Sequence, residues 1–397
     1  MVQWQQYARE LPADSGRNHG KERLYMKKLG FGCMRLPLLD PEKRDSVDME
    51  KFCRMVDTFL ERGFTYFDTA YVYHDYQSEN IVRRALVERH PRDSFTLATK
   101  LPLWDMKEDG DKERLFAEQL EKCGVDYFDY YLIHNLGEEH YKVATRFDCF
   151  GFVSRMKAEG KVRKMGFSFH DKAEVLDRIL TDHPEVDFVQ LQINYLDWED
   201  EKIQSRLCYE TARRHGKPVV VMEPVKGGKL ADLSPAAEGL LKSRAPEASL
   251  PSWAIRFAAG LEGVMVVLSG MSDQQQLEDN TGYMAQFRPL DGEERALLER
   301  AADILRGEDA IGCTACRYCT EGCPMHIPIP DYFSLYNRGE GAEGGLTALS
   351  GEYAALAAAA GRASDCIACR QCEQTCPQHL EIVNLLKDVA KIFENQK

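Results

Sequence analysis

The chain has 397 residues, of which 44% are hydrophobic and 29% are charged, a composition that suits a globular protein with one large and one small domain. It carries 51 Lys and Arg residues against 64 Asp and Glu residues, which gives a formal net charge of -13. This acidic balance argues against nucleic acid or an anionic membrane as a partner, because either would bind a basic surface.

The N-terminal segment lacks an apolar signal core and a twin-arginine pair, and no apolar run approaches the ~20 residues that a membrane-spanning helix needs. We therefore expect a cytoplasmic protein. Eight of the 13 cysteines fall into two closely spaced runs near the C-terminus. The others are expected to be small buried residues: Cys33, Cys53, Cys123, Cys149 and Cys208.

Short apolar or β-branched runs recur at near-regular intervals from residue 29 to residue 285, and a stretch with helical periodicity follows each of them. The expected strands are residues 29–34, 64–69, 95–100, 127–134, 164–168, 188–194, 218–224 and 263–270. Eight strand-then-helix units in ~250 residues are typical of a closed (β/α)8 TIM barrel, an α/β fold. We expect this barrel to occupy residues 1–290.

Polar residues stand at the C-terminal ends of consecutive expected strands, where packing does not require them. These residues are Asp68, Lys100, His134, Ser168, Gln192, Glu223 and Ser269. A single polar strand end is more often a satisfied loop residue than a catalytic one. A whole set that converges on one end of a barrel favours an active site there.

Asp68, Tyr73, Lys100 and His134 are the strongest catalytic candidates, because Tyr73 follows the second expected strand closely enough to lie over the same end of the barrel. A tyrosine has an ordinary pKa of about 10, and we expect the Lys100 ammonium to lower it. Asp68 would hold Lys100 in its charged form, and His134 would orient a carbonyl oxygen as a neutral donor. The set predicts a general acid that faces a polarised carbonyl, which suits hydride transfer to the carbon.

Both cysteine runs have the spacing C-x2-C-x2-C-x3-C-P, by which bacterial ferredoxins hold cubane clusters. A structural zinc site usually has two separated pairs, and disulfide frameworks belong to secreted chains. We therefore expect two [4Fe-4S] clusters, held by Cys313, Cys316, Cys319, Cys323, Cys366, Cys369, Cys372 and Cys376.

In two-cluster ferredoxins the fourth cysteine of each run binds the other cluster. This pattern groups Cys376 with the first three cysteines of the first run, and Cys323 with the first three of the second run. The 42 residues between Cys323 and Cys366 are too many for a compact ferredoxin, and PDYFSLYN and GEYAALAAAAG within them indicate helices. We expect a small, mostly helical ferredoxin-like domain over residues 291–397.

The segments FDTAYVY (67–73), ATK (98–100) and YLIH (131–134) resemble the aldo-keto reductases, in which an Asp, a Tyr, a Lys and a His stand in these contexts. With the two cysteine runs, the chain resembles the branch that carries a C-terminal two-cluster [4Fe-4S] domain. The resemblance implies an NAD(P)-dependent oxidoreductase that transfers a hydride between NADPH or NADH and a small carbonyl or alcohol substrate.

The resemblance also implies contacts with the nicotinamide cofactor. The backbone of Gly32 and Cys33 would contact the nicotinamide, Ser168 and Gln192 would bind its carboxamide, and Met222 would pack on its ring face. Lys226 and Lys229 would bind the pyrophosphate. The residues implied on the adenosine side are Gly270, Ser272, Glu278 and Asn280. Ser272 stands where members that prefer NADP place an Arg or a Lys against the 2′-phosphate. We therefore expect only a modest preference for NADPH over NADH.

A hydride donor moves two electrons together, whereas a [4Fe-4S] cluster passes them singly. One hypothesis is an enzyme whose clusters link the barrel, through a flavin or a radical step, to a ferredoxin or flavoprotein partner. A second is a redox-sensing or electron-transfer module in which the barrel binds nucleotide without turnover. A third is that the clusters only brace the C-terminal domain. The complete catalytic set favours the enzyme, because a sensor needs neither the acid nor its lysine.

Overall fold

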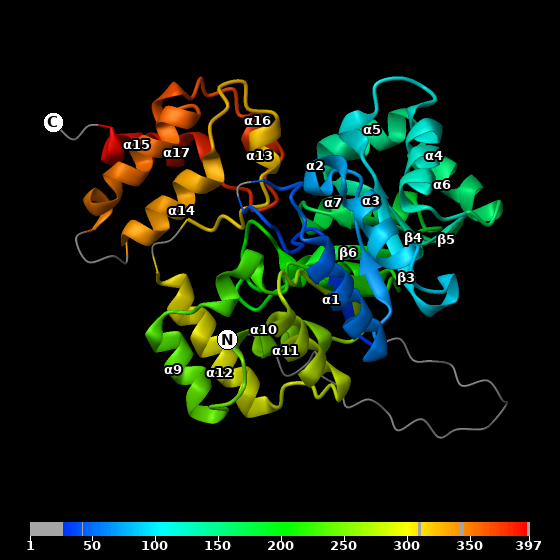
Figure 1. Ribbon diagram of the computed structural model, residues 1–397, viewed down its shortest axis with the longest axis horizontal. Helices are drawn as coiled ribbons and strands as arrows, with labels where there is room; N and C mark the ends of the chain where they lie inside the picture. The colour runs from blue at the N-terminus through cyan, green and yellow to red at the C-terminus, as the bar shows by residue number, and fades with distance from the viewer. Residues whose placement is uncertain (1–26, 42, 309–310, 341–344, 395–397) are drawn as a thin grey trace.

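Eight parallel strands close into a barrel in the computed structural model, which describes residues 27–41, 43–308, 311–340 and 345–394 (Figure 1). Each strand pairs with the next in sequence, and the first pairs with the last. The strands are β1 Leu29–Gly32, β2 Tyr66–Asp68, β3 Thr96–Leu101, β4 Phe128–Leu136, β5 Val162–Phe169, β6 Phe188–Gln192, β7 Val219–Met222 and β8 Val264–Ser269. All eight overlap the expected strands, so the (β/α)8 prediction is confirmed.

Helices surround the strands. They are α1 Met49–Glu61, α2 Tyr73–Tyr76, α3 Ser78–Val82, the π-helix η2 Arg83–Val87, α4 Asp111–Cys123, α5 Glu138–Arg146, α6 Cys149–Ala158, α7 Ala173–Asp182, α8 Ser205–Arg214, α9 Pro235–Arg244, α10 Leu250–Ala259, α11 Gln274–Ala285 and α12 Gly292–Arg306. Short 3-10 helices lie between these elements at η3 Arg92–Ser94, η4 Leu103–Asp105 and η5 Lys226–Ala231. No helix in the described part of the chain is long and apolar enough to cross a membrane.

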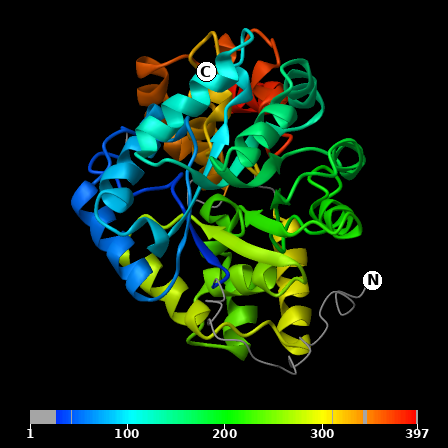
Figure 2. The same cartoon turned by 90° about the vertical axis from the view of Figure 1, so that its right-hand side faces the viewer.

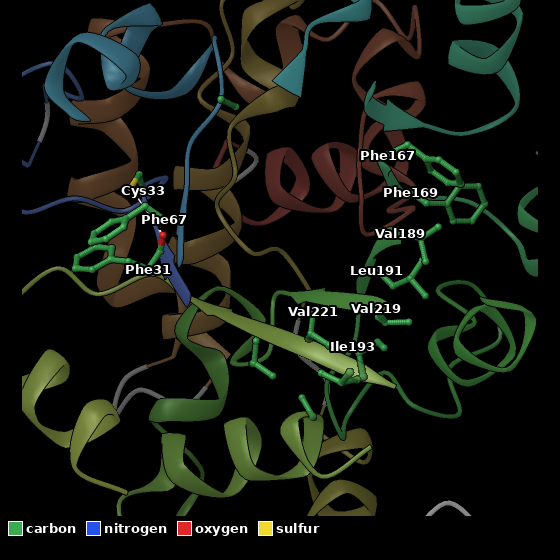
Figure 3. Close-up of a cluster of buried hydrophobic side chains, with 14 of the residues drawn as sticks. Phe31, Cys33, Phe67, Phe167, Phe169, Val189, Leu191, Ile193, Val219 and Val221 are labelled. Atoms are coloured by element: carbon green, nitrogen blue, oxygen red, sulfur yellow. Dashed lines mark hydrogen bonds between the residues drawn. The ribbon is translucent and has the colours of Figure 1, made fainter. Parts of the chain in front are cut away.

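Successive side chains along each strand point alternately outward, into the core between strands and helices, and inward, into the barrel interior. Phe31 and Phe67 point outward, where Phe31 stacks on Phe67 at 5.8 Å between ring centroids and meets Phe59 of α1 edge-on at 5.4 Å. Figure 3 shows Cys33 beside these rings. On the far side of the barrel, the outward residues of β5 to β7 form the same layer. The intervening residues, such as Tyr66, face the interior of the barrel.

The C-terminal domain has a small core of its own and is mostly helical, as expected. Its helices are α13 Tyr318–Glu321, α14 Ile329–Glu340, α15 Ser350–Ala359, α16 Gln371–Gln374 and α17 Ile382–Phe393, with the short 3-10 helices η6 Leu346–Leu349 and η7 Ala363–Asp365. Tyr353 of α15 stacks on Phe393 of α17 at 5.0 Å and lies 4.8 Å from Tyr332 of α14. These aromatic contacts join the three longer helices.

The helix α12 precedes the cysteine runs but packs with the barrel. Its buried Leu298, Ala301 and Leu305 belong to the barrel core, and its capping box at Asp291 starts it directly after α11 and its loop. We therefore propose that the domain boundary follows α12, whereas the sequence led us to expect it at residue 290. Residues 1–26 of the expected barrel domain lie outside the described residues.

The C-terminal domain contacts the barrel at the C-terminal ends of the strands. Arg35, after β1, donates to the Thr314 carbonyl at 2.7 Å, and the amides of Gln192 on β6 and Gln378 are hydrogen-bonded at 3.1 Å. In Figure 1, α13 and α16 are the C-terminal elements nearest to α2, and Figure 2 shows the C-terminal helices across one end of the barrel. Both cysteine runs therefore face the end of the barrel at which the polar residues gather.

Candidate active site and iron–sulfur sites

A cavity of about 410 Å³ opens where the barrel meets the C-terminal domain. This volume lies within the range of about 300–1,000 Å³ that is usual for small-molecule sites. The expected residues on its wall are Gly32, Asp68, Tyr73, His134, Ser168, Met222, Gly270, Ser272 and Asn280. The C-terminal domain contributes Thr314, Cys316, Tyr318, Pro377 and Gln378. Both domains thus build one site.

A buried ion pair lies beneath Tyr73. Lys100 is fully buried, and its Nζ donates to Asp68 Oδ1 at 2.6 Å and to the Thr69 carbonyl at 2.7 Å. The same Nζ lies 5.1 Å from the centroid of the Tyr73 ring. The His134 ring meets the Tyr73 ring edge-on at 6.2 Å. The structure thus brings the four catalytic candidates together, with only Lys100 set behind the cavity wall.

Burial controls the charge states of these residues. Desolvation, and then the Asp68 carboxylate, raise the pKa of Tyr73 above its ordinary value. The expectation that Lys100 lowers this pKa is therefore not met, because burial and the Asp68 carboxylate dominate the electrostatics at Tyr73. Tyr73 keeps its proton at neutral pH and can donate it.

His134 is neutral, as expected. Burial, and then the Lys100 ammonium, hold the pKa of His134 well below its usual value. Its Nδ1 has no hydrogen-bond partner among the described residues. The imidazole is therefore free to bond a carbonyl oxygen or another ligand in the cavity.

A second part of the wall suits a nicotinamide carboxamide. Ser168 and Gln190 line the cavity near Met222, and the Gln190 amide nitrogen lies 3.5 Å from the Met222 sulfur. The buried Gln190 Oε1 has no partner within the described residues, a condition that is costly unless a ligand donates to it. Sequence reasoning chose Gln192, which is two residues along the same strand and thus on the same face.

Gln192 and Lys226 are engaged at the domain interface and do not line the cavity. Gln192 donates to Asp197 at 2.9 Å, and Lys226 forms a buried ion pair with Asp197 and donates to Gln378 Oε1 at 3.0 Å. Three other residues expected at the cofactor also lie off the wall: Cys33 is buried in the outer core, Lys229 is half-buried on η5, and Glu278 is exposed on α11. Their cofactor roles stay predictions.

Arg35 is a cation on the cavity wall that the sequence did not single out. Its backbone carbonyl accepts a hydrogen bond from the Ser272 hydroxyl at 2.9 Å, and its guanidinium donates to the Thr314 carbonyl at 2.7 Å. The guanidinium lies 3.9 Å from Glu223, which partly neutralises it. An arginine after the first strand has no distinctive spacing, and only the fold places it beside residue 272.

The eight cysteines form two groups, and each group lines its own cavity. The proximal group is Cys313, Cys316, Cys319 and Cys376, and the distal group is Cys323, Cys366, Cys369 and Cys372. This is the crossed grouping expected from the spacing. In the described ranges, no three His, Cys, Asp or Glu side chains converge as they would around one metal ion. The four cysteines of each group border one common cavity, as the ligands of a multi-atom cluster do.

The backbone of each run also suits an anionic cluster. Ala315 and Arg317 have positive φ values of 53° and 66°, and Ala368 and Arg370 repeat them at 55° and 61°. Alternation of this kind turns successive N–H groups toward one point, a concavity found at many iron–sulfur sites. The Ala315 N–H donates to the Cys313 sulfur at 3.4 Å. The residues present therefore fit two [4Fe-4S] clusters.

The two groups differ in what they face. Cys316 of the proximal group lines the main cavity, whereas Cys369 of the distal group is exposed beside Ile367, whose side chain is 61% exposed. The order from the inside outward is main cavity, proximal group, distal group and solvent.

Comparisons with known proteins agree with both halves of the chain. The model of the "Aldo/keto reductase family" matches residues 28–303, and that of the "4Fe-4S dicluster domain" matches residues 312–380. "Probable aldo-keto reductase 1" of Glycine max is 29% identical over 202 residues, which cover 48% of this chain and 55% of that protein, so the chain spans about half of that relative's length. "Uncharacterized oxidoreductase YqkF" of Bacillus subtilis is 25% identical over 313 residues, 71% of this chain and 95% of that protein.

Solved structures share the barrel fold. The holo form of aldo-keto reductase AKR11C1 from Bacillus halodurans has a TM-score of 0.54 at 24% identity and covers 69% of this chain and 91% of its own. An aldo-keto reductase from Klebsiella pneumoniae, solved in complex with NADPH, has a TM-score of 0.54 at 20% identity, with coverages of 69% and 90%.

The crossed grouping generates a prediction about cluster loss. Anaerobically purified protein should hold about eight iron atoms and eight acid-labile sulfides per chain. Cys376→Ser should alter the paramagnetic signal of the proximal cluster and spare the distal one, and Cys323→Ser should do the reverse. Cys53→Ser, outside both groups, is the control. If Cys376→Ser changes only the distal cluster, each run closes its own cluster and the grouping is wrong.

Proposed function

This chain belongs to the aldo/keto reductase family and carries a C-terminal 4Fe-4S dicluster domain, and from this we propose that it transfers a hydride between a nicotinamide cofactor and a small carbonyl or alcohol substrate. The observation that carries the proposal is the position of Tyr73 on the cavity wall above the Lys100–Asp68 pair. The NADPH complex of the Klebsiella pneumoniae relative supports the choice of cofactor.

We assign the chemistry of the carbonyl oxygen to Tyr73 and His134. A bound nicotinamide supplies the hydride to the carbonyl carbon. The Tyr73 hydroxyl donates its proton to the oxygen as negative charge develops there. The Lys100 ammonium, fixed by Asp68, stabilises the phenolate that remains, and neutral His134 orients the oxygen without competing for the proton.

We assign cofactor binding to the wall opposite Tyr73. Ser168 and Gln190 hold the carboxamide, and the free Gln190 Oε1 accepts from its amide. Gly32 brings backbone close to the site, since a Cβ there would lie 3.4 Å from the Ser269 carbonyl. Ser272, Asn280 and the Arg35 guanidinium border the far end of the cavity, toward the phosphates and adenosine.

The clusters, in this proposal, exchange single electrons with a ferredoxin or flavoprotein partner. The exposed distal group is the entry point for those electrons, and the proximal group stands between it and the cavity. The flavin considered from the sequence has no support in the comparisons, which leaves the radical step: Cys316 lines the cavity, so the proximal cluster would exchange single electrons with a substrate that forms a radical there.

Removal of the proposed acid tests the enzyme hypothesis. Tyr73→Phe should lower carbonyl reduction about 10²- to 10⁴-fold, because the proton donor is lost while the cofactor contacts remain. Steady-state rates on a carbonyl panel and a fluorescence titration with NADPH give the two quantities. Tyr71→Phe is the matched control, because its hydroxyl bonds Glu118 away from the cavity. Unchanged turnover in Tyr73→Phe would move the acid elsewhere, with His170 the next candidate.

Ser272 predicts the cofactor preference. A charge-assisted hydrogen bond contributes ~1.5–3 kcal/mol, which corresponds to about tenfold or more in affinity. Without a cation against the 2′-phosphate, NADPH should therefore bind less than about tenfold more tightly than NADH. Titration of the wild-type protein with NADPH and with NADH measures the ratio. A hundredfold preference for NADPH contradicts the prediction, and a loss of that preference in Arg35→Met would then identify Arg35 as the cation.

A further inference from the structure

Tyr318 belongs to the first cysteine run but contacts the active site. It borders the main cavity beside Tyr73 and His134, and its hydroxyl lies close enough to the Tyr73 hydroxyl to counteract the rise in the Tyr73 pKa. Its ring lies 6.5 Å from the His134 ring and 6.4 Å from that of Trp104, which in turn lies 4.9 Å from His134. Tyr318 thus stands where a substrate must approach the acid.

The same residue is joined to the proximal group through its backbone. Tyr318 lies between Cys316 and Cys319 in the sequence, and its backbone N–H faces the Cys316 sulfur. A single residue is therefore next to a proposed cluster ligand through its main chain and next to the proposed acid through its side chain.

The second cysteine run provides an internal comparison. The first run reads CTACRYCTEGCP (313–324) and the second reads CIACRQCEQTCP (366–377), with the same backbone conformation at their Ala and Arg residues. Tyr318 corresponds to Gln371, which is exposed to solvent. A cluster loop of this conformation accommodates glutamine, so the loop itself does not require a tyrosine. The tyrosine occurs at the copy of this position that lines the main cavity.

The residues two positions after the fourth cysteine of each run also differ between the runs. Met325 follows Cys323 and Pro324, whereas Gln378 follows Cys376 and Pro377. Gln378 bonds Lys226 and Gln192 of the barrel. Where the runs contact the barrel, each therefore carries a residue that the other lacks, Tyr318 in the first run and Gln378 after the second.

We propose that Tyr318 is a positioning residue of the active site, which donates a hydrogen bond to the Tyr73 oxygen and turns the Tyr73 proton toward the substrate. A phenol has one proton and two lone pairs, so Tyr73 can accept from Tyr318 while it donates to a carbonyl oxygen. The accepted bond also stabilises the charge that grows on the Tyr73 oxygen as its proton leaves. The inference rests on the proposed role of Tyr73 as the acid.

The experiment is a double-mutant cycle in the anaerobic, cluster-loaded protein. Tyr318→Phe keeps the ring and removes the hydroxyl, and it should lower kcat roughly tenfold to a hundredfold with NADPH affinity and carbonyl KM nearly unchanged. In a Tyr73→Phe background the same change should have no further effect, because Tyr318 acts through Tyr73. Iron content and both paramagnetic signals should stay at wild-type levels.

Two further variants keep the test independent of folding. Tyr318→Gln installs the residue that the second run already carries, and it should match Tyr318→Phe in kcat while it retains both clusters. Gln371→Tyr is the matched control and should leave kcat unchanged.

An unchanged kcat in Tyr318→Phe, a loss that persists in the Tyr73→Phe background, or an equal loss in Gln371→Tyr would each overturn the inference. If Tyr73→Phe alone has no effect on kcat, the proposed function fails. If Tyr73→Phe lowers kcat but Tyr318→Phe does not, only the inference about Tyr318 fails.

Discussion

The buried ammonium of Lys226 holds the two halves of the protein in one arrangement. Lys226 is 7% exposed, and it pairs with Asp197 of the barrel and donates to Gln378 of the C-terminal domain. A buried charge is costly unless it is paired and hydrogen-bonded, so the network is complete only when the domains are docked. Docking brings Thr314 and Tyr318 to the cavity. The composition of the active site therefore depends on this contact.

This arrangement bears on the mismatch between hydride and single-electron carriers. Cys316 and Tyr73 line one cavity, so a molecule bound there contacts the acid and lies beside the proximal group. No intermediate layer of protein separates the two chemistries. In the proposed function, electrons enter from a partner at the exposed distal group, and the proximal group passes them toward the cavity. Clusters that only braced the C-terminal domain would not require a cysteine on the cavity wall.

Local patterns predicted the barrel and the two cysteine groups, because strands, helices and cluster ligands follow short-range spacing. The same patterns could not separate Gln190 from Gln192, since both face the interior of β6. The sequence did not single out Tyr318, because its neighbour Tyr73 is far away in the sequence. Lys226 was expected at the pyrophosphate, yet its partner Gln378 lies 152 residues further along the chain. Such contacts depend on how the domains dock, which no local pattern records.

The placement of the first cysteine run over the reaction cavity is tested most directly by magnetic resonance. NADPH deuterated at C4 of the nicotinamide is bound to the dithionite-reduced protein, and electron–nuclear double resonance is recorded on the signal of each cluster. The arrangement described here predicts a deuterium coupling to the proximal cluster, absent from the distal one and lost in Cys376→Ser. Bound NADPH with no deuterium coupling to the proximal cluster would contradict it.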